Sequence, residues 1–358
     1  MPLTTVSPGL LDSTAQYYSF KNRIINGAMV IDQRNAGASI TFNDGVFPVD
    51  RWTTVATQSS KGTIQQNAGA VTPPAGFINY LGFTSSSAYS VLTGDAFAIQ
   101  QRIEGLNLSD LGWGSANAQT VTLSFWVRSS LTGTFGGVIS NSAQNRSYPF
   151  TYTISSANTW ELETVTIPGD TSGTWLTTNG IGARLNLGLG AGATYSGTAG
   201  AWSGSTLFTA TGATSVVGTN GATFYITGVQ LEKGSTATSF DYRPYGTELA
   251  LCQRYYEKTY NIDVVPGAAS DLGASLIRPP STSVNISVPF KVTKRATPSV
   301  TVYSPVTGTS SRFRNYSTSA DVTIGGVAFI GTSTASPYYD SATANNQYAF
   351  QMVTESEL

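Results

Sequence analysis

Apolar and polar residues alternate along much of this chain, and the spacing of an amphipathic helix is almost absent. In the segment VTLSFWVRSS, the side chains Val121, Leu123, Phe125 and Val127 would share one face of a strand. A second segment, ARLNLGLG, repeats the pattern through its leucines. Strands of this kind between turns rich in Gly and Asn predict an all-β domain, a β-sandwich or jelly roll, over residues 21–245.

Residues 246–260, GTELALCQRYYEKTY, form the one convincing helical segment. Leu249, Cys252 and Tyr256 recur at three- and four-residue spacing, and Tyr255 lies on a second apolar edge. A short helix with two apolar edges needs neighbours on two sides. We therefore predict that Leu249, Cys252, Tyr255 and Tyr256 form the interface of a homotrimer. A helix wedged between two domains would satisfy the same pattern.

The two ends of the chain differ in character. Residues 261–358 return to alternation and predict a second, smaller β domain, whose core two or more subunits would complete. Residues 1–20 contain two prolines and apolar residues without a repeating face, which predicts an extended arm that attaches to another protein. A frayed terminus is the alternative. The proposed anchors of the arm are Leu10, Leu11, Tyr17 and Tyr18.

The composition excludes several classes of function. Charged residues make up 11% of the chain and the net charge is −1, so nothing favours nucleic acid or an anionic membrane. The chain has no histidine, the commonest general base and metal ligand, and a single cysteine, Cys252. No apolar run reaches the length of a membrane span, and no secretory signal is visible. We expect the protein to fold in a reducing cytoplasm.

Catalytic patterns are weak. Glu161 and Glu163 share a strand face, as a carboxylate pair in a glycosidase would, but a solvated strand face explains them better. Asp44, Asp50 and Asp95 lie in turn-like settings, where they would cap the backbone or hold a structural Ca²⁺. We expect no catalytic residue and no cofactor.

Aromatic residues are the better candidates for binding. Trp126 and Arg128 lie on the strand face opposite the apolar one, where a flat indole can stack on a sugar ring. In the distal domain, Tyr338, Tyr339 and Asp340 offer a similar combination of rings and polar groups. We predict weak binding of a cell-surface glycan at one of these places. The alternative is that these rings are covered by loops or by a neighbouring subunit.

One short string stands out near the start of the chain. The string NRIINGAMVIDQRN, residues 22–35, reads as the first strand of the sandwich, and FPVDRW follows it. We expect Arg51 to pair with Asp50 or Asp32 and lock one end of the domain, with Trp52 packed beneath.

These segments resemble a module that recurs in structural proteins of tailed bacteriophages. The string NRIINGAMVIDQRN, then FPVDRW, LSFWVRSS and TWELETVTIPGD, are similar to its start and middle, and its most specific part is ITGVQLEKGSTATSFDYRPYGTELALCQRYYEKTY. The resemblance covers about residues 21–260. It implies a jelly roll similar to carbohydrate-binding modules, a helix and a distal β domain, in a virion appendage that is typically trimeric.

Three functions compete on these grounds. The first is a non-enzymatic tail fibre or receptor-binding protein that docks by its N-terminal arm and presents β domains to the host surface. The second is a capsid-decorating or head-fibre protein. A polysaccharide depolymerase is disfavoured, because such fibres need a long repetitive β-helix and no repeat is visible. The expected partners are the chain itself, other virion proteins and a host glycan, and the expected location is the virion after synthesis in the host cytoplasm.

Overall fold

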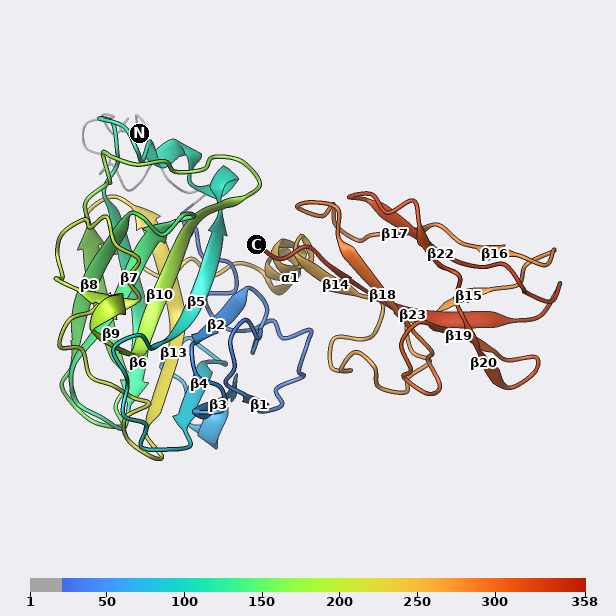
Figure 1. Ribbon diagram of the computed structural model, residues 1–358, viewed down its shortest axis with the longest axis horizontal. Coiled ribbons are helices and arrows are strands. Elements are labelled where there is room, and N and C mark those ends of the chain that lie inside the picture. The colour runs from blue at the N-terminus through green and yellow to red at the C-terminus, as the bar shows by residue number, and fades with distance from the viewer. Residues whose placement is uncertain (1–20) are drawn as a thin grey trace, which may run out of the picture.

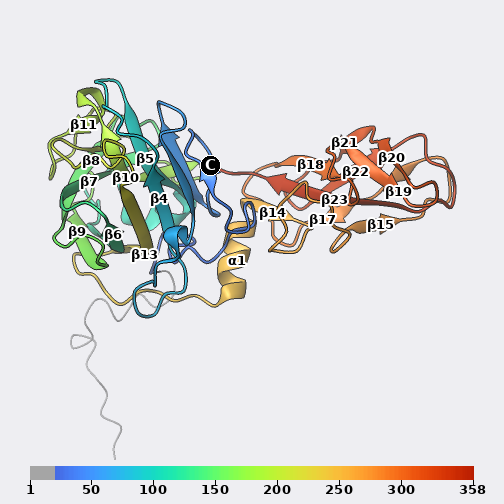
Figure 2. The same ribbon diagram turned by 90° about the horizontal axis from the view of Figure 1, so that it is seen from below.

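The computed structural model describes residues 21–358, in which a β-sandwich is joined to a smaller, elongated β domain (Figure 1). The one α-helix in these residues, α1 (Tyr245–Gln253), lies at the junction, and the C-terminus returns to the same place (Figures 1 and 2). The predicted all-β class, with a sandwich, a short helix and a smaller distal β domain, is confirmed. The trimer stays a prediction, and the arm anchors Leu10, Leu11, Tyr17 and Tyr18 lie outside the described residues.

The sandwich consists of two antiparallel sheets. Sheet A runs in the order β1 (Ile40–Thr41), β3 (Gly62–Gln66), β4 (Leu81–Ser85), β13 (Thr223–Lys233), β6 (Val121–Ser129), β9 (Glu161–Ile167). Sheet B runs in the order β2 (Trp52–Ala56), β5 (Ala96–Glu104), β10 (Ile181–Ala191), β7 (Gly133–Asn141), β8 (Ser147–Ile154). Short 3-10 turns occupy Ala68–Ala70, Gly105–Asn107, Ser109–Leu111 and Ala193–Tyr195.

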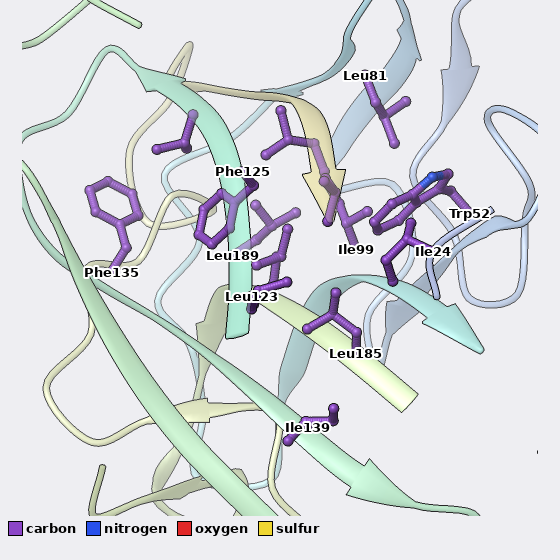
Figure 3. Packing of buried hydrophobic residues seen from close by; sticks show 14 of the residues in the cluster. Ile24, Trp52, Leu81, Ile99, Leu123, Phe125, Phe135, Ile139, Leu185 and Leu189 are labelled. Carbon is purple, nitrogen blue, oxygen red and sulfur yellow. The ribbon is translucent and has the colours of Figure 1, made fainter. Parts of the chain in front are cut away.

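The alternation seen in the sequence fills the space between these sheets. Leu123 and Phe125 of β6 point inward from sheet A, and Leu185 and Leu189 of β10 face them from sheet B (Figure 3). Trp52 lies at one end of this core beside Ile24 and is fully buried (Figure 3). The predicted inward faces of β6 and β10 are confirmed, because alternate side chains of a strand must lie on opposite faces.

The distal domain is built around the last strand of the chain. β23 (Tyr348–Glu355) pairs with β14, β15, β18 and β19, and a second, small sheet is centred on β22 (Thr334–Tyr339). The other strands of the domain are β14 (Tyr256–Lys258), β15 (Ser275–Ile277), β16 (Val284–Asn285), β17 (Val288–Pro289), β18 (Ser299–Tyr303), β19 (Arg312–Asn315), β20 (Ala320–Thr323), which pairs with β19, and β21 (Gly326–Ala328). Its core is small, with Val284, Phe313, Tyr348 and Phe350 at the centre.

The helix is shorter than the predicted 246–260. It ends at Gln253, and Tyr256–Lys258 instead forms β14, which pairs with β23 in the register Tyr256 to Glu355. The apolar spacing of this segment therefore serves a helix and a strand in turn. A partner strand about a hundred residues away decides where the helix stops.

The opening string is not a strand. Asn26 and Met29 have positive φ angles of 58° and 57°, so the chain turns twice within a few residues. These turns bury both sides of the segment: Ile24 and Met29 join the sandwich core, while Ile25 and Ile31 face α1. A strand would have exposed one of these two sets.

In the sequence, the apolar alternation changes phase within TWELETVTIPG and near Gly228, which predicts a bulge at each place, and the two predictions have different outcomes. Near Gly228, whose φ is +61°, the pairing of β13 with β6 shifts between Thr227 and Gln230, as expected for a bulge. By contrast, β9 pairs with β6 without a shift, so the bulge expected within Glu161–Ile167 is wrong.

The Gly-rich segment after β10 lies over the outer face of sheet B. Within it, β11 (Ser196–Gly197) pairs with β12 (Thr209–Ala210), and β12 contacts β7, β8 and β10. A Cβ atom on Gly136 or Gly188 would come within 2.5 Å or 2.7 Å of the Thr209 side chain. Glycine is therefore required on the strands so that this loop can lie flat against them.

Candidate functional site

Trp126 lies on the outer face of sheet A, as predicted. It projects from β6 between Thr227 of β13 and Leu162 of β9, on the face opposite the core. The indole is half-buried, so loops cover part of it and leave part accessible. Leu162, its neighbour on the edge strand, is 55% exposed.

Further rings gather beside Trp126 from two loops. Phe77 packs edge-on against Phe240 with ring centroids 5.1 Å apart, and Tyr242 lies 4.9 Å from Phe240. Phe77 and Trp126 both border Gly228, since a Cβ atom there would meet each ring within 3.1 Å. Tyr242 is 58% exposed. Together they form what we call the outer aromatic patch: Phe77, Trp126, Leu162, Phe240 and Tyr242.

Arg128 lies on the same face of β6, two residues beyond Trp126. Its Nε donates to the Asn158 carbonyl at 2.9 Å, and its guanidinium lies 5.5 Å from the centre of the Tyr225 ring. These contacts hold the turn between β8 and β9 against sheet A. Arg128 therefore supports the edge of the patch.

The second predicted glycan site lies in the distal domain, away from the first. The Tyr338 ring packs on Gly325, where a Cβ atom would be only 2.4 Å from it. Tyr339 lies at the margin of the distal core, 6.0 Å from the ring of Tyr348. Asp340 is exposed. Both rings are half-buried by their own chain.

The residues predicted to form a trimer interface are covered within one chain. Cys252 and Tyr255 are fully buried against Ile25 and Ile31 of the opening string. Tyr256 packs in a separate cluster of the distal domain, and Leu249 is half-buried beside Cys252. Residues of both apolar edges, Cys252 and Tyr255, thus pack in one cluster with the opening string, and Tyr256, beyond the end of the helix, packs in the distal domain of the same molecule. The apolar edges of this segment therefore no longer argue for other subunits against the helix.

The opening string and the VDRW segment instead build the junction between the domains. Arg51 does not pair with Asp50 or Asp32, contrary to expectation; it pairs with Glu357, and its guanidinium lies 3.5 Å from the centre of the Tyr255 ring. Arg34 pairs with Glu355 at 3.1 Å and Glu357 at 3.0 Å. Two arginines of the sandwich therefore hold the C-terminal end of the chain.

Other polar groups complete this junction. Trp52 packs beneath it, as expected, and its Nε1 donates to the Asn26 carbonyl at 3.0 Å. Gln33 donates to Asp50 at 2.8 Å and to the Tyr256 carbonyl at 2.9 Å. A junction held by so many buried polar contacts fixes the orientation of the two domains.

Asp50 gives this junction a dependence on pH. Burial raises the pKa of its carboxyl from 3.8 to about 6, an effect that the Arg34 guanidinium partly opposes. The folded state therefore binds this proton more tightly than the unfolded chain does. The contribution of Asp50 to the free energy of unfolding is present below pH 3.8 and is lost as the pH rises to about 6. We expect this loss to be about 3 kcal/mol.

Urea unfolding between pH 3.5 and pH 7.5, at intervals of about half a unit, measures this contribution. The Asp50→Asn variant is the control, because it cannot titrate at this position. Wild type should lose stability relative to the variant as the pH rises through the window and should then stay level. A difference that does not change with pH would contradict a raised pKa for Asp50.

The carboxylates considered for catalysis or metal binding have separate partners. Glu161 accepts bonds from the Ser155 and Ser156 backbone, and Glu163 has a raised pKa from burial and from Glu161. Asp44 accepts from the Ala56 backbone, and Asp95 accepts from four groups near it. Within residues 21–358, no three acidic or Cys side chains come together in a way that would hold a metal ion.

Sequence reasoning missed two groupings on the sandwich. Trp113, Trp175 and Trp202 converge from separate loops, with ring centroids 4.6 to 5.7 Å apart. On the outer face of sheet B, Arg102 and Arg184 are direct cross-strand neighbours. No local sequence pattern predicts either grouping. For the arginine pair, an outward-facing Arg on each of two buried strands was a usable signal.

Comparisons with known proteins give only distant similarity. No family model and no curated protein matches the sequence. The enzymatically active domain of tailspike protein 4 of bacteriophage CBA120 matches 60% of this chain over 21% of its own length, at 14% identity and a TM-score of 0.31. The module TmCBM61, solved with β-1,4-galactotriose, matches 60% of this chain over 99% of its own, at 11% identity and a TM-score of 0.30.

A putative sugar-binding protein from Bacteroides thetaiotaomicron is similar to the same extent. It matches 60% of this chain over 100% of its own, at 14% identity and a TM-score of 0.33. At such scores these structures are distant neighbours in fold. What those proteins bind is a property of those proteins. The site in this chain is inferred from the geometry described above.

Proposed function

We propose that this chain is a non-enzymatic appendage of a tailed-phage virion, a tail fibre or receptor-binding protein that binds a glycan of the host surface. The observation that carries the proposal is the outer aromatic patch, which presents partly accessible rings on a firm sheet. Sugars have apolar C–H faces that stack on such rings and polar edges that need hydrogen bonds nearby. Arg128 and the surrounding Ser, Thr and Asn residues provide those bonds.

The resemblance of the opening string and of the region around α1 to phage structural proteins supports the virion role. The junction adds a physical reason, because a chain that presents one domain to a surface and attaches by another benefits from a fixed angle between them. We further propose that three copies assemble through the distal domain, where Phe329 is 80% exposed and Leu272 and Leu276 are more than half exposed. Several weak sites on one particle raise its avidity by orders of magnitude.

Adsorption of particles to host cells tests the glycan-binding role. Trp126→Ala and Tyr242→Ala remove rings from the patch and should each reduce adsorption about tenfold or more, since stacking losses multiply over several sites. The melting temperature of the Tyr242→Ala protein should stay close to that of wild type, because this ring is largely exposed.

The matched comparison is the pair Tyr338→Ala and Asp340→Ala in the distal domain. Reduced adsorption for this pair alone would overturn the patch as the binding site. Unchanged adsorption for all four variants would overturn receptor binding and favour the capsid-decorating or head-fibre role. Density of the intact particle that places the chain on the head would also favour that role.

A further inference from the structure

The outer face of sheet B has a cluster of polar groups that the aromatic patch does not use. Arg102 and Gln100 of β5 lie directly opposite Arg184 and Asn186 of β10, so the four side chains share one face. We call this set the two-arginine face. The intervening residues Leu185 and Leu187 point into the core, which fixes the direction of the polar set.

The two guanidinium groups face each other with no Asp or Glu side chain of residues 21–358 between them. In residues 21–358, neither Arg102 nor Arg184 has a carboxylate side chain within 4.0 Å. Glu357 and Asp44 act on Arg102 from farther away, whereas the charged group that acts on Arg184 is Arg102 itself. Burial, and then Arg102, lower the pKa of Arg184 to about 10. Like charges that lie directly opposite on neighbouring strands destabilise the sheet.

The same face has more hydrogen-bond donors than acceptors. The Gln100 Oε1 atom accepts from Arg102 at 2.9 Å and from Arg184 at 3.4 Å, and the Gln100 amide donates to Asn186 at 2.7 Å. The Nε of Arg184 and the Nδ2 of Asn186 are buried without an acceptor. Asn186 is 0% exposed, so water does not satisfy it from the surface. Unpaired buried donors of this kind are costly.

The surroundings limit what could supply the missing acceptors. Thr209 closes one end of the face over Gly136 and Gly188, and a main-chain oxygen of Leu358, the last residue of the chain, accepts from Arg102 at the other end. Both arginine residues remain partly exposed between these ends. A small, acceptor-rich group that carries negative charge would neutralise both arginines from the solvent side, whereas the buried Asn186 amide stays out of its reach.

We propose that the two-arginine face binds the carboxylate of an acidic sugar, such as a uronic acid residue in a host surface glycan. A carboxylate can accept two parallel bonds from one guanidinium and neutralise the second. This proposal deepens the proposed function, because it names the class of glycan that the sandwich selects. It uses a different face from the outer aromatic patch, so either one can fail while the other stands.

Titration of the purified full chain with sodium glucuronate, glucose and sodium sulfate at constant ionic strength tests the proposal. Calorimetry should show saturable binding of glucuronate in the millimolar range, with glucose at least tenfold weaker. Sulfate should also be at least tenfold weaker, since it lacks the sugar ring. Equal affinity for sulfate and glucuronate, or no saturable binding of glucuronate, would overturn the proposal.

Variants separate binding from folding. Arg184→Met keeps the apolar stem, should weaken glucuronate binding at least tenfold, and should leave the ligand-free melting temperature unchanged or higher because it removes a like-charge contact. Arg184→Lys keeps the charge without the bidentate geometry and should give an intermediate loss. Arg278→Met, at an exposed arginine of the distal domain, should change nothing. Unaltered glucuronate affinity in both Arg184 variants would exclude this face. Loss of host adsorption in the patch variants would still support the proposed function in that case.

Discussion

Replacing Glu357 with alanine is expected to lower the free energy of unfolding by about 3–5 kcal/mol, because it leaves the buried Arg51 without its ion-pair partner and removes one of the two partners of Arg34. The Glu357 side chain is 8% exposed and pairs with both Arg34 and Arg51, and the Arg51 side chain is 2% exposed. The loss would also release the C-terminal segment, which Ser356 ties to the Tyr255 carbonyl at 2.7 Å. Urea unfolding followed by tryptophan fluorescence measures this change.

Glu355 is a matched control two residues away. It pairs with the same Arg34 at 3.1 Å, but its side chain is 40% exposed. An exposed pair contributes less than about 1 kcal/mol, so Glu355→Ala should have a small effect. Similar losses for the two variants would show that burial does not decide the strength of this network, and the junction described above would then be wrong.

The faces of the central strands could be predicted from the sequence because they depend on local alternation. Leu123 and Phe125 of β6 had to lie on the side opposite Trp126, whatever the rest of the chain does. The bulge at Gly228 was likewise visible as a change of phase. These features need only neighbouring residues to be read correctly.

The junction could not be predicted because its partners are far apart in the sequence. Arg51 is separated from Glu357 by 306 residues, and two nearby acids, Asp32 and Asp50, were more obvious choices. Tyr256 has the spacing of a helix, yet pairing with Glu355 at the far end of the chain makes it part of a strand. The two-arginine face is similar, since Arg102 and Arg184 lie far apart in the sequence and no local pattern predicts that they meet.

The thiol of Cys252 is expected to be almost unreactive in the native protein. It is the one cysteine of the chain and is fully buried between α1 and the opening string, and burial raises its pKa well above the usual range. A thiol reagent attacks the thiolate, so labelling requires the junction to open. The native protein should therefore react several orders of magnitude more slowly than the protein unfolded in urea.

Labelling rates also connect this thiol to Glu357. Leu358 packs against the Cys252 cluster, so release of the C-terminal segment in Glu357→Ala uncovers the thiol. A loss of about 3–5 kcal/mol corresponds to labelling roughly a hundred to several thousand times faster, when reclosing is faster than reaction. Glu355→Ala should label nearly as slowly as wild type. A different result would place Cys252 at an interface between subunits: fast labelling at concentrations where the wild-type protein is monomeric, and slow labelling only where copies associate. If α1 is covered within one chain, the labelling rate of Cys252 must not depend on protein concentration.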